Sequence, residues 1–407
     1  MARISSIILA ALIITAPVAY AERFEKPIHA SLAWRGGKVT IDHRFGKLDL
    51  HTTSGNQVNV QGVVKCSDPD IGREIHFNVS EGGGGITIRT DVPEIHNHGG
   101  NLSYSIDIEV SVPANAPLSI RNRFGGIYAS GVHAPSEFTN AQGSVTVSDL
   151  RGSQQIENSF GSVTVTNSAG DTVVRNANGS VTATHIGGSL DVSDRFGSVS
   201  VEDVDHALAL RNENGSVDVR NVGGNATIST SFATATVSNI RGTLDLTGAN
   251  GNIVVTETGR ASIRTSFGSV RATTIHGDAE VHDENGNVTL AGVDGSAKVR
   301  TTFGSAFLKD IDGSISVENT NGAISVGELP PGKCRDISLK TNFSNIRVAL
   351  RSGTGYNVHA GTSFGSIRSE LPITARGSLS QENITGTING GGCRLDLETA
   401  NGNITIE

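Results

Sequence analysis

Glycine recurs at a nearly constant nine-residue step between residues 124 and 322. The series lacks a glycine where His206 and Ala233 hold the slot, and one step shortens to eight, between Gly251 and Gly259. A fixed period of this kind is typical of stacked repeat architectures, in which each unit buries its apolar face only against its neighbours. Nine residues are too few for a helix with its turn, but they fit one strand and one corner.

The residues two and four positions after each glycine are mostly Val, Ile, Leu or Ala, with a polar residue between them, as in 163–165 and 190–192. This alternation predicts strands with one buried face. Asn-Gly corners would also suit hairpins, but hairpins do not require identical corners at every step. We therefore predict an all-β fold, a single-chain parallel β-solenoid of strand–corner units. Two strands per 18-residue coil is the preferred count, and four strands per 36-residue coil is the alternative, with Phe above Phe and Asn above Asn; the handedness stays open.

Two residue types alternate before the glycine at every second corner. Glycine accepts the positive φ of a tight corner, Asn tolerates the left-handed region better than most residues, and Phe can act as an apolar wedge that plugs a narrow core. We predict that these residues are structural corners rather than chemical groups: Phe160, Asn178, Phe196, Asn214, Phe232, Asn250, Phe267, Asn285, Phe303 and Asn321.

The chain divides into four predicted segments. Residues 1–21 have a basic start, an apolar stretch and a small-residue cleavage site, so they predict a signal peptide. Residues 22–123 form an irregular β section that caps the stack, with loops at 69–71 and 92–100. Residues 124–326 form the regular solenoid, and residues 327–407 form irregular C-terminal coils. We expect an exported protein that is periplasmic, secreted or peripheral at a bacterial surface, with no transmembrane segment after cleavage.

The two ends of the array raise separate questions. The chain stops in mid-pattern, and an uncapped last coil would expose a strand edge. We expect this edge to self-associate, to bind a partner or to be covered by residues 370–392. Cys334 and Cys393 precede similar strands, so they look like equivalent repeat positions. If several coils separate them, they are too distant to bond, and we expect no disulfide.

No cluster of chemical groups emerges from the pattern. Residues 361–365 match a nucleophile-elbow motif, but no helical pattern follows it. The acids lack the fixed spacing of calcium-binding repeats, and His96 and His98 have no further ligand at metal-binding spacing. We therefore expect no catalytic residue, no metal and no cofactor. The net charge of −8, with acids and bases interspersed, argues against a nucleic-acid partner.

The strand that ends at Val110-Ser-Val-Pro113, followed by residues 118–127 and the Phe-Gly-Ser-Val and Asn-Gly-Ser-Val coils, carries a family resemblance. The chain resembles the bacterial putative-adhesin family of β-strand repeat proteins, a domain of unknown function, and is similar in kind to autotransporter-head adhesin domains. The resemblance implies an exported β-solenoid and supplies no catalytic residues.

Two functions are compatible with these observations. The first is a non-enzymatic scaffold, an adhesin or envelope-associated protein that presents its surface to a glycan or an envelope protein. The alternative is a polysaccharide-active β-helix enzyme, a lyase or hydrolase, which would need clustered carboxylates or bases in one groove. If the function is localised, we expect it where the repeat breaks, at 22–123, 327–342 and 370–392.

Overall fold

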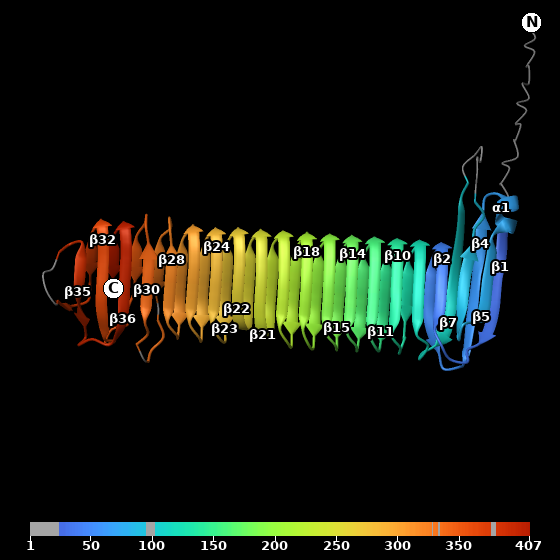
Figure 1. The fold of residues 1–407 in the computed structure, drawn as a ribbon, viewed down its shortest axis with the longest axis horizontal. Coiled ribbons are helices and arrows are strands. Elements are labelled where there is room, and N and C mark those ends of the chain that lie inside the picture. Colours follow the sequence, from blue (N-terminus) through green and yellow to red (C-terminus); the bar gives the residue numbers. More distant parts are fainter. Residues whose placement is uncertain (1–23, 95–101, 328, 333, 376–379) are drawn as a thin grey trace, which may run out of the picture.

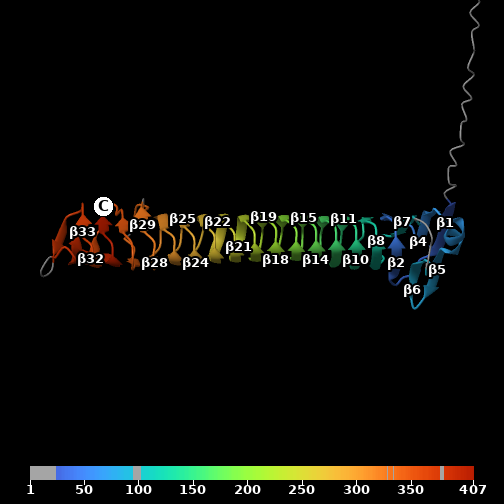
Figure 2. The ribbon, with the colours of Figure 1, turned by 90° about the horizontal axis from the view of Figure 1, so that it is seen from above.

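The protein is a narrow rod of stacked coils in the computed structural model (Figure 1). The chain winds through about 13 turns, and its regular secondary structure is almost entirely strand, so the predicted β-solenoid is confirmed. Seen from above, the rod has two thin layers of strands (Figure 2). The structure describes residues 24–94, 102–327, 329–332, 334–375 and 380–407, and both the predicted signal peptide and the His96/His98 pair lie outside them.

Each regular coil contains two strands and 18 residues. Strand β12 (Gln154–Phe160) pairs in parallel with β14 (Thr172–Asn178), with Gln154 beside Thr172 and Phe160 beside Asn178. The preferred coil is therefore confirmed and the 36-residue alternative is wrong, since Phe stacks on Asn. The shortened glycine step appears as a register shift between Ile240 and Thr243 where β21 pairs with β22.

Each coil contributes one strand to each of two layers, and the first layer is the one that contains β12 and β14. From the N-terminal end of the rod to the C-terminal end, its members are β5 (His76–Gly82), β6 (Gly85–Asp91), β2 (Val39–Phe45), β8 (Leu118–Phe124), β10 (Ser136–Gln142), β12, β14, β16 (Leu190–Phe196), β18 (Leu208–Asn214), β20 (Ala226–Phe232), parts of β21 (Ala235–Asn250) and β22 (Ile253–Phe267), β24 (Ala279–Asn285), β26 (Ala297–Phe303), β28 (Ile315–Asn319), β30 (Ile337–Thr341), β36 (Cys393–Asn401), β32 (Tyr356–Phe364), β35 (Asn383–Ile388) and β34 (Ile373–Ala375).

The other layer contains the remaining strands and the other parts of β21 and β22. In the same direction these are β1 (Phe24–Ala33), β4 (Gln57–Cys66), β7 (Tyr104–Pro113), β3 (Leu48–Thr53), β9 (Ile127–Ser130), β11 (Val145–Leu150), β13 (Val163–Ser168), β15 (Val181–Ile186), β17 (Val199–Val204), β19 (Val217–Val222), β23 (Val270–Ile275), β25 (Val288–Val293), β27 (Ala306–Ile311), β29 (Ile324–Gly327), β31 (Ile346–Val348), β37 (Ile404–Ile406) and β33 (Ile367–Ser369).

The core between the layers is built from the predicted aliphatic columns, but it also contains a polar column that the sequence analysis missed. Two residues beyond the inward pair of nearly every coil in the first layer, a third side chain points inward and is buried; Gly248 takes this position in one coil. In several coils this is an Asn whose amide donates to the carbonyl of the corner glycine three residues later, as from Asn158 to Gly161 at 2.8 Å. The buried members include His43, Asn122, Asn140, Asn158, Asn176, Asp194, Asn212, Thr230, Thr265, Asp283, Thr301 and Asn319.

The corners differ from the prediction in where the left-handed backbone lies. The corner Asn residues do not have positive φ; the following glycine has it in several coils, as at Gly161 with φ 127°. Of the ten described non-glycine residues with positive φ, all but Asn389 occupy the opposite corner, directly before an inward residue. These nine are Asp149, Asn167, His185, Asp203, Asn221, Asn239, Glu257, Thr274 and Asp310. Their side chains form a ladder in places, such as the hydrogen bond from Asn221 to Asp203 at 2.8 Å.

At the N-terminal end the coil of β2 and β3 lies inside the stack, because β2 pairs with both β6 and β8. Antiparallel strands β1, β4 and β5 cover the end. The loop expected at 69–71 is instead the start of helix α1 (Pro69–Glu74). Asp68 caps this helix by accepting hydrogen bonds from the backbone N–H groups of Asp70 and Ile71.

At the C-terminal end the last coil is also internal. Strand β36 pairs with β30 on one side and with β32 on the other, so the final coil inserts into the stack (Figure 1). The expectation that the last coil exposes its edge is therefore wrong. The outer edge belongs to β32 instead, and antiparallel β35, which lies within residues 370–392, covers it. Self-association there stays a prediction.

This insertion also overturns the expectation about the cysteines. Because β30 and β36 are direct neighbours, Cys334 and Cys393 lie at adjacent rather than distant repeat positions, with Cα atoms 5.7 Å apart, and they form a disulfide. The third cysteine, Cys66, is free and buried in β4.

Candidate functional site

A line of exposed aromatic side chains runs along one corner of the rod. Phe160, Phe196, Phe232, Phe267 and Phe303 are each between 50 and 63 % exposed. Through strand pairing each Phe lies beside an Asn of the neighbouring coil, so Phe and Asn alternate along the rod. Adjacent strands are about 4.8 Å apart, so successive Phe residues are separated by about 9.6 Å. We call this line, from Phe160 to Phe303, the Phe–Asn edge.

The expectation that these Phe side chains plug the core is wrong. Strict alternation along β12 would point Phe160 inward after Asn158, but Asn158 already closes the core at the corner by bonding to Gly161. The chain turns at this point, and Phe160 is left outside. About half of each Phe residue stays in contact with solvent, so packing in the core does not account for its repetition.

The rest of the edge is polar and mostly uncharged. Asn178 is half-buried, and its amide donates to the carbonyl of Ser159 at 3.1 Å, which fixes the side chain between two aromatic neighbours. A parallel column of Ser and Asn follows the corner glycines; in it, Ser216 donates to Ser198 at 2.9 Å. The edge therefore combines aromatic faces with hydroxyl and amide groups.

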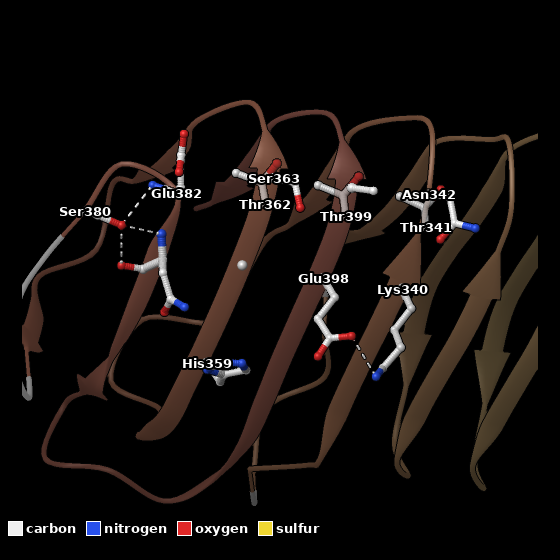
Figure 3. A pocket seen from close by; sticks show the side chains of 13 residues that line it. Lys340, Thr341, Asn342, His359, Thr362, Ser363, Ser380, Glu382, Glu398 and Thr399 are labelled. Carbon is white, nitrogen blue, oxygen red and sulfur yellow. Dashed lines mark hydrogen bonds and ion pairs between the residues drawn. The ribbon is translucent and has the colours of Figure 1, made fainter.

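A second feature is a hollow of about 580 Å³ near the C-terminal end (Figure 3). It lies over β30, β36 and β32 and is bordered by residues 380–383. Gly361 creates much of it, because a Cβ there would meet no heavy atom within 4 Å. In the strand register Gly361 lies between Glu398 and Asn383, so one position in an outward row carries no side chain.

Charged side chains line the floor of this hollow. Glu398 pairs with Lys340 at 2.8 Å, and Figure 3 shows its carboxylate between Lys340 and His359. The hydrogen bond and the negative charge of Glu398 raise the pKa of Lys340 above its usual range. His359 stands beside Asp396 in the strand register, and its Nδ1 lies 3.4 Å from the hydroxyl of Thr385.

The nucleophile-elbow pattern does not assemble a catalytic set among the described residues. Residues 361–364 belong to strand β32, and the chain continues into β33 rather than into a helix. Ser363 lines the hollow, but no hydrogen bond connects it to His359 in the part of the chain that the structure describes. The repeat pattern in the sequence does not reveal the hollow, because the strands that form it come from segments far apart in the chain.

The fold and its surface define a β-solenoid repeat protein with an exposed aromatic edge. Residues 234–407 match the family described as Toastrack DUF4097. Over these residues the resemblance to a β-strand repeat family of unknown function is thereby confirmed.

Two solved structures are similar to this chain. A putative cell adhesion protein from Clostridium sporogenes ATCC 15579 is 9 % identical, over 94 % of this chain and 99 % of that one, with a TM-score of 0.18. A putative adhesin from Bacteroides fragilis NCTC 9343 is 12 % identical, over 72 % of this chain and 97 % of that one, with a TM-score of 0.22. With TM-scores this low, nothing about this chain rests on either. No curated protein is significantly similar to the chain.

Among the described residues, no helix has the length and apolar character needed to cross a membrane.

Proposed function

We propose that this protein is an exported, non-enzymatic adhesive scaffold whose Phe–Asn edge binds an extended, neutral glycan. The observation that carries the proposal is the row of half-exposed Phe side chains at every second coil. Aromatic faces stack on the apolar faces of sugar rings, and fixed amide and hydroxyl groups accept and donate hydrogen bonds to sugar hydroxyls.

The spacing of the edge supports a chain rather than a single sugar. Successive Phe residues repeat at about 9.6 Å, twice the distance between neighbouring coils. An extended β-linked glycan presents the same ring face at every second sugar, so a ribbon-like chain could meet Phe after Phe. Around Phe232, Phe267 and Phe303 the adjoining residues are Ser, Ala, Thr or Gly, which favours an uncharged partner.

Two other partners fit this edge less well. A second copy of the chain would need to bury about 1,200 Å² or more for a stable interface, and the edge is a single residue wide. A nucleic acid would require a basic surface, whereas the chain carries a net charge of −8. Export is supported by the predicted signal peptide and by the Cys334–Cys393 disulfide, a bond that persists mainly in oxidising compartments.

Binding to neutral polysaccharides tests this proposal. We expect the protein to bind insoluble cellulose or chitin, or a soluble mixed-linkage β-glucan, and not to bind anionic alginate. Changing Phe196, Phe232 and Phe267 together to Ser should weaken binding at least tenfold, since each lost stacking contact costs about 1 kcal/mol.

The matched control is Phe307→Ser. Phe307 is 42 % exposed, but it lies on the outward face of β27 rather than on the edge. Failure to bind any neutral glycan, or equal weakening by Phe307→Ser, would contradict the proposal. If the wild-type protein sedimented as an oligomer and the triple variant as a monomer, the edge would be a self-association surface instead.

One observation favours the enzymatic alternative. The hollow gathers Glu382 and Glu398 beside His359, and clustered carboxylates are what a polysaccharide-cleaving site requires. However, one oxygen of Glu398 is already paired with the ammonium group of Lys340 at 2.8 Å. Release of reducing ends from the bound polysaccharides would support this alternative, and its absence with intact binding would support the scaffold.

A further inference from the structure

Several outward carboxylates near the middle and C-terminal part of the rod form an ion pair with a basic residue on a neighbouring strand. These pairs are Asp191–Arg175, Asp278–Arg260, Glu280–Lys298, Glu318–Arg300, Glu398–Lys340 and Glu407–Arg347. Asp396 differs, because it has no ion pair among the described residues. Its Oδ1 is shielded from solvent and lacks a hydrogen-bond partner. A carboxylate oxygen that is shielded from water and has no hydrogen-bond partner is unfavourable unless a positive ligand binds it.

The residues around Asp396 include two further metal-binding groups. His359 on β32 lies directly beside Asp396 on β36, and Glu398 is two residues further along the same face of β36. One ligand atom from each of these three side chains lies within 4.8 Å of the others. Both strands are held on each side by neighbouring strands, so the three groups stand on a rigid base.

Gly361 lies beside Glu398 in the strand register and leaves the Glu398 carboxylate accessible. Because Gly361 has no side chain, the Glu398 oxygen that Lys340 does not hold faces the hollow. His359 is exposed at the same floor, and its Nδ1 lies next to Thr385, which leaves Nε2 as a second possible ligand atom. A small ion can therefore reach His359 and Glu398 from the hollow, and Asp396 lies directly beside His359 in the strand register.

We propose that His359, Asp396 and Glu398 bind a divalent transition-metal ion of the zinc class. One imidazole nitrogen and two carboxylate oxygens match the ligand preferences of Zn²⁺, whereas Ca²⁺ and Mg²⁺ prefer oxygen ligands alone. Three protein ligands leave at least one coordination position open to the hollow, where water or a donor group of a bound partner completes the shell. This site is independent of glycan binding at the Phe–Asn edge.

Titration of the untagged protein with Zn²⁺, Mg²⁺ and Ca²⁺ by calorimetry tests the site. We expect one Zn²⁺ per chain, with much weaker binding of the other two ions. Asp396→Asn and His359→Gln should each lower the Zn²⁺ affinity at least tenfold. Glu280→Gln is the matched control, because it removes an outward carboxylate that is already paired with Lys298, and it should leave Zn²⁺ binding unchanged.

A second readout keeps the test valid if one variant folds poorly. Zn²⁺ should raise the thermal midpoint of the wild-type protein, since a ligand that binds only the native state stabilises it, and this rise should disappear in His359→Gln. His359 is exposed, so its substitution leaves the core intact. Absence of saturable Zn²⁺ binding, or binding that survives both substitutions, would overturn the proposal.

Discussion

The regular coils and the C-terminal coils use the same strands in two different ways. In the regular stack each coil pairs with the coils directly before and after it in the sequence, as β14 does with β12 and β16. At the C-terminal end β36 inserts between β30 and β32, so spatial order and chain order separate. The same reordering occurs at the N-terminal end, where β2 lies between β6 and β8.

This difference shows where a solenoid can depart from its repeat. A coil in the middle of the stack must match both neighbours, so its corners and its inward column are constrained at every step. The ends instead need their strand edges covered, and both are covered by antiparallel strands. The out-of-order C-terminal coil also brings Asp396 beside His359, which a simple continuation of the repeat would not do.

The largest expected effect concerns the disulfide that fastens the inserted coil. Changing Cys334 and Cys393 together to Ser should destabilise the C-terminal coils by about 4 kcal/mol, because the bond closes a long loop. Hydrogen exchange should accelerate in β30, β36 and β37 and stay unchanged in β14 to β19, since each coil contacts only its neighbours.

The control for this experiment is Cys66→Ala, which removes the free thiol of β4 and should not alter exchange at the C-terminal end. Adding a reductant to the wild-type protein should reproduce the double substitution. If exchange rose equally along the whole rod, the regular stack and the C-terminal coils would form one cooperative unit, and the contrast between them would fail.

The sequence predicted the regular stack well because its information is local. The glycine step and the aliphatic pairs fix the 18-residue coil, and each pair of strands is close in the chain. The exposure of Phe160 was not predictable from alternation, because it depends on Asn158 closing the core first. The buried polar column itself was visible in the sequence as a polar residue at a constant position after nearly every inward pair.

The hollow could not be predicted in the same way. His359 and Asp396 become neighbours only when β36 inserts beside β32, and strand periodicity says nothing about which coil pairs with which. A signal was present in the similar starts at Cys334-Arg-Asp and Cys393-Arg-Leu, which mark two equivalent positions. If coils stacked in chain order, these two equivalent positions would lie several coils apart. The similarity therefore predicted that Cys334 and Cys393 are distant rather than in contact.

A smaller difference in stability is expected between alanine substitutions of two glycines, Gly161 in the regular stack and Gly361 in the hollow. A Cβ on Gly161 would lie 2.3 Å from the carbonyl oxygen of Gly143, and the residue has φ 127°, so Gly161→Ala should destabilise the regular stack by about 3 kcal/mol. Gly361→Ala meets open space in the middle of β32 and should be neutral or slightly stabilising. Denaturant unfolding of both variants checks this, and equal losses would mean that the hollow is as tightly constrained as the stack.

The smallest expected effect is a pH-dependent change in the free energy of unfolding, caused by two Asp residues in the buried polar column. Asp194 and Asp283 stand where other coils have Asn or Thr, and burial raises the pKa of each carboxyl to about 6. The usual value for Asp is about 3.9, so the folded state binds more protons than the unfolded state between about pH 4 and 6. Stability should therefore fall as the pH rises through this window.

Asp194→Asn restores the residue found in both neighbouring coils, at Asn176 and Asn212. It should stabilise the protein by about 1–2 kcal/mol at pH 7.5 and change little at pH 4, because the carboxyl is then already neutral. Asp191→Asn, on the exposed face of the same strand, removes a surface ion pair with Arg175 and should cost about 0–1 kcal/mol. Urea unfolding at the two pH values distinguishes these outcomes. A loss of stability in Asp194→Asn at pH 7.5 would show that the charged carboxylate supports its coil, and the polar column would then not be interchangeable from coil to coil.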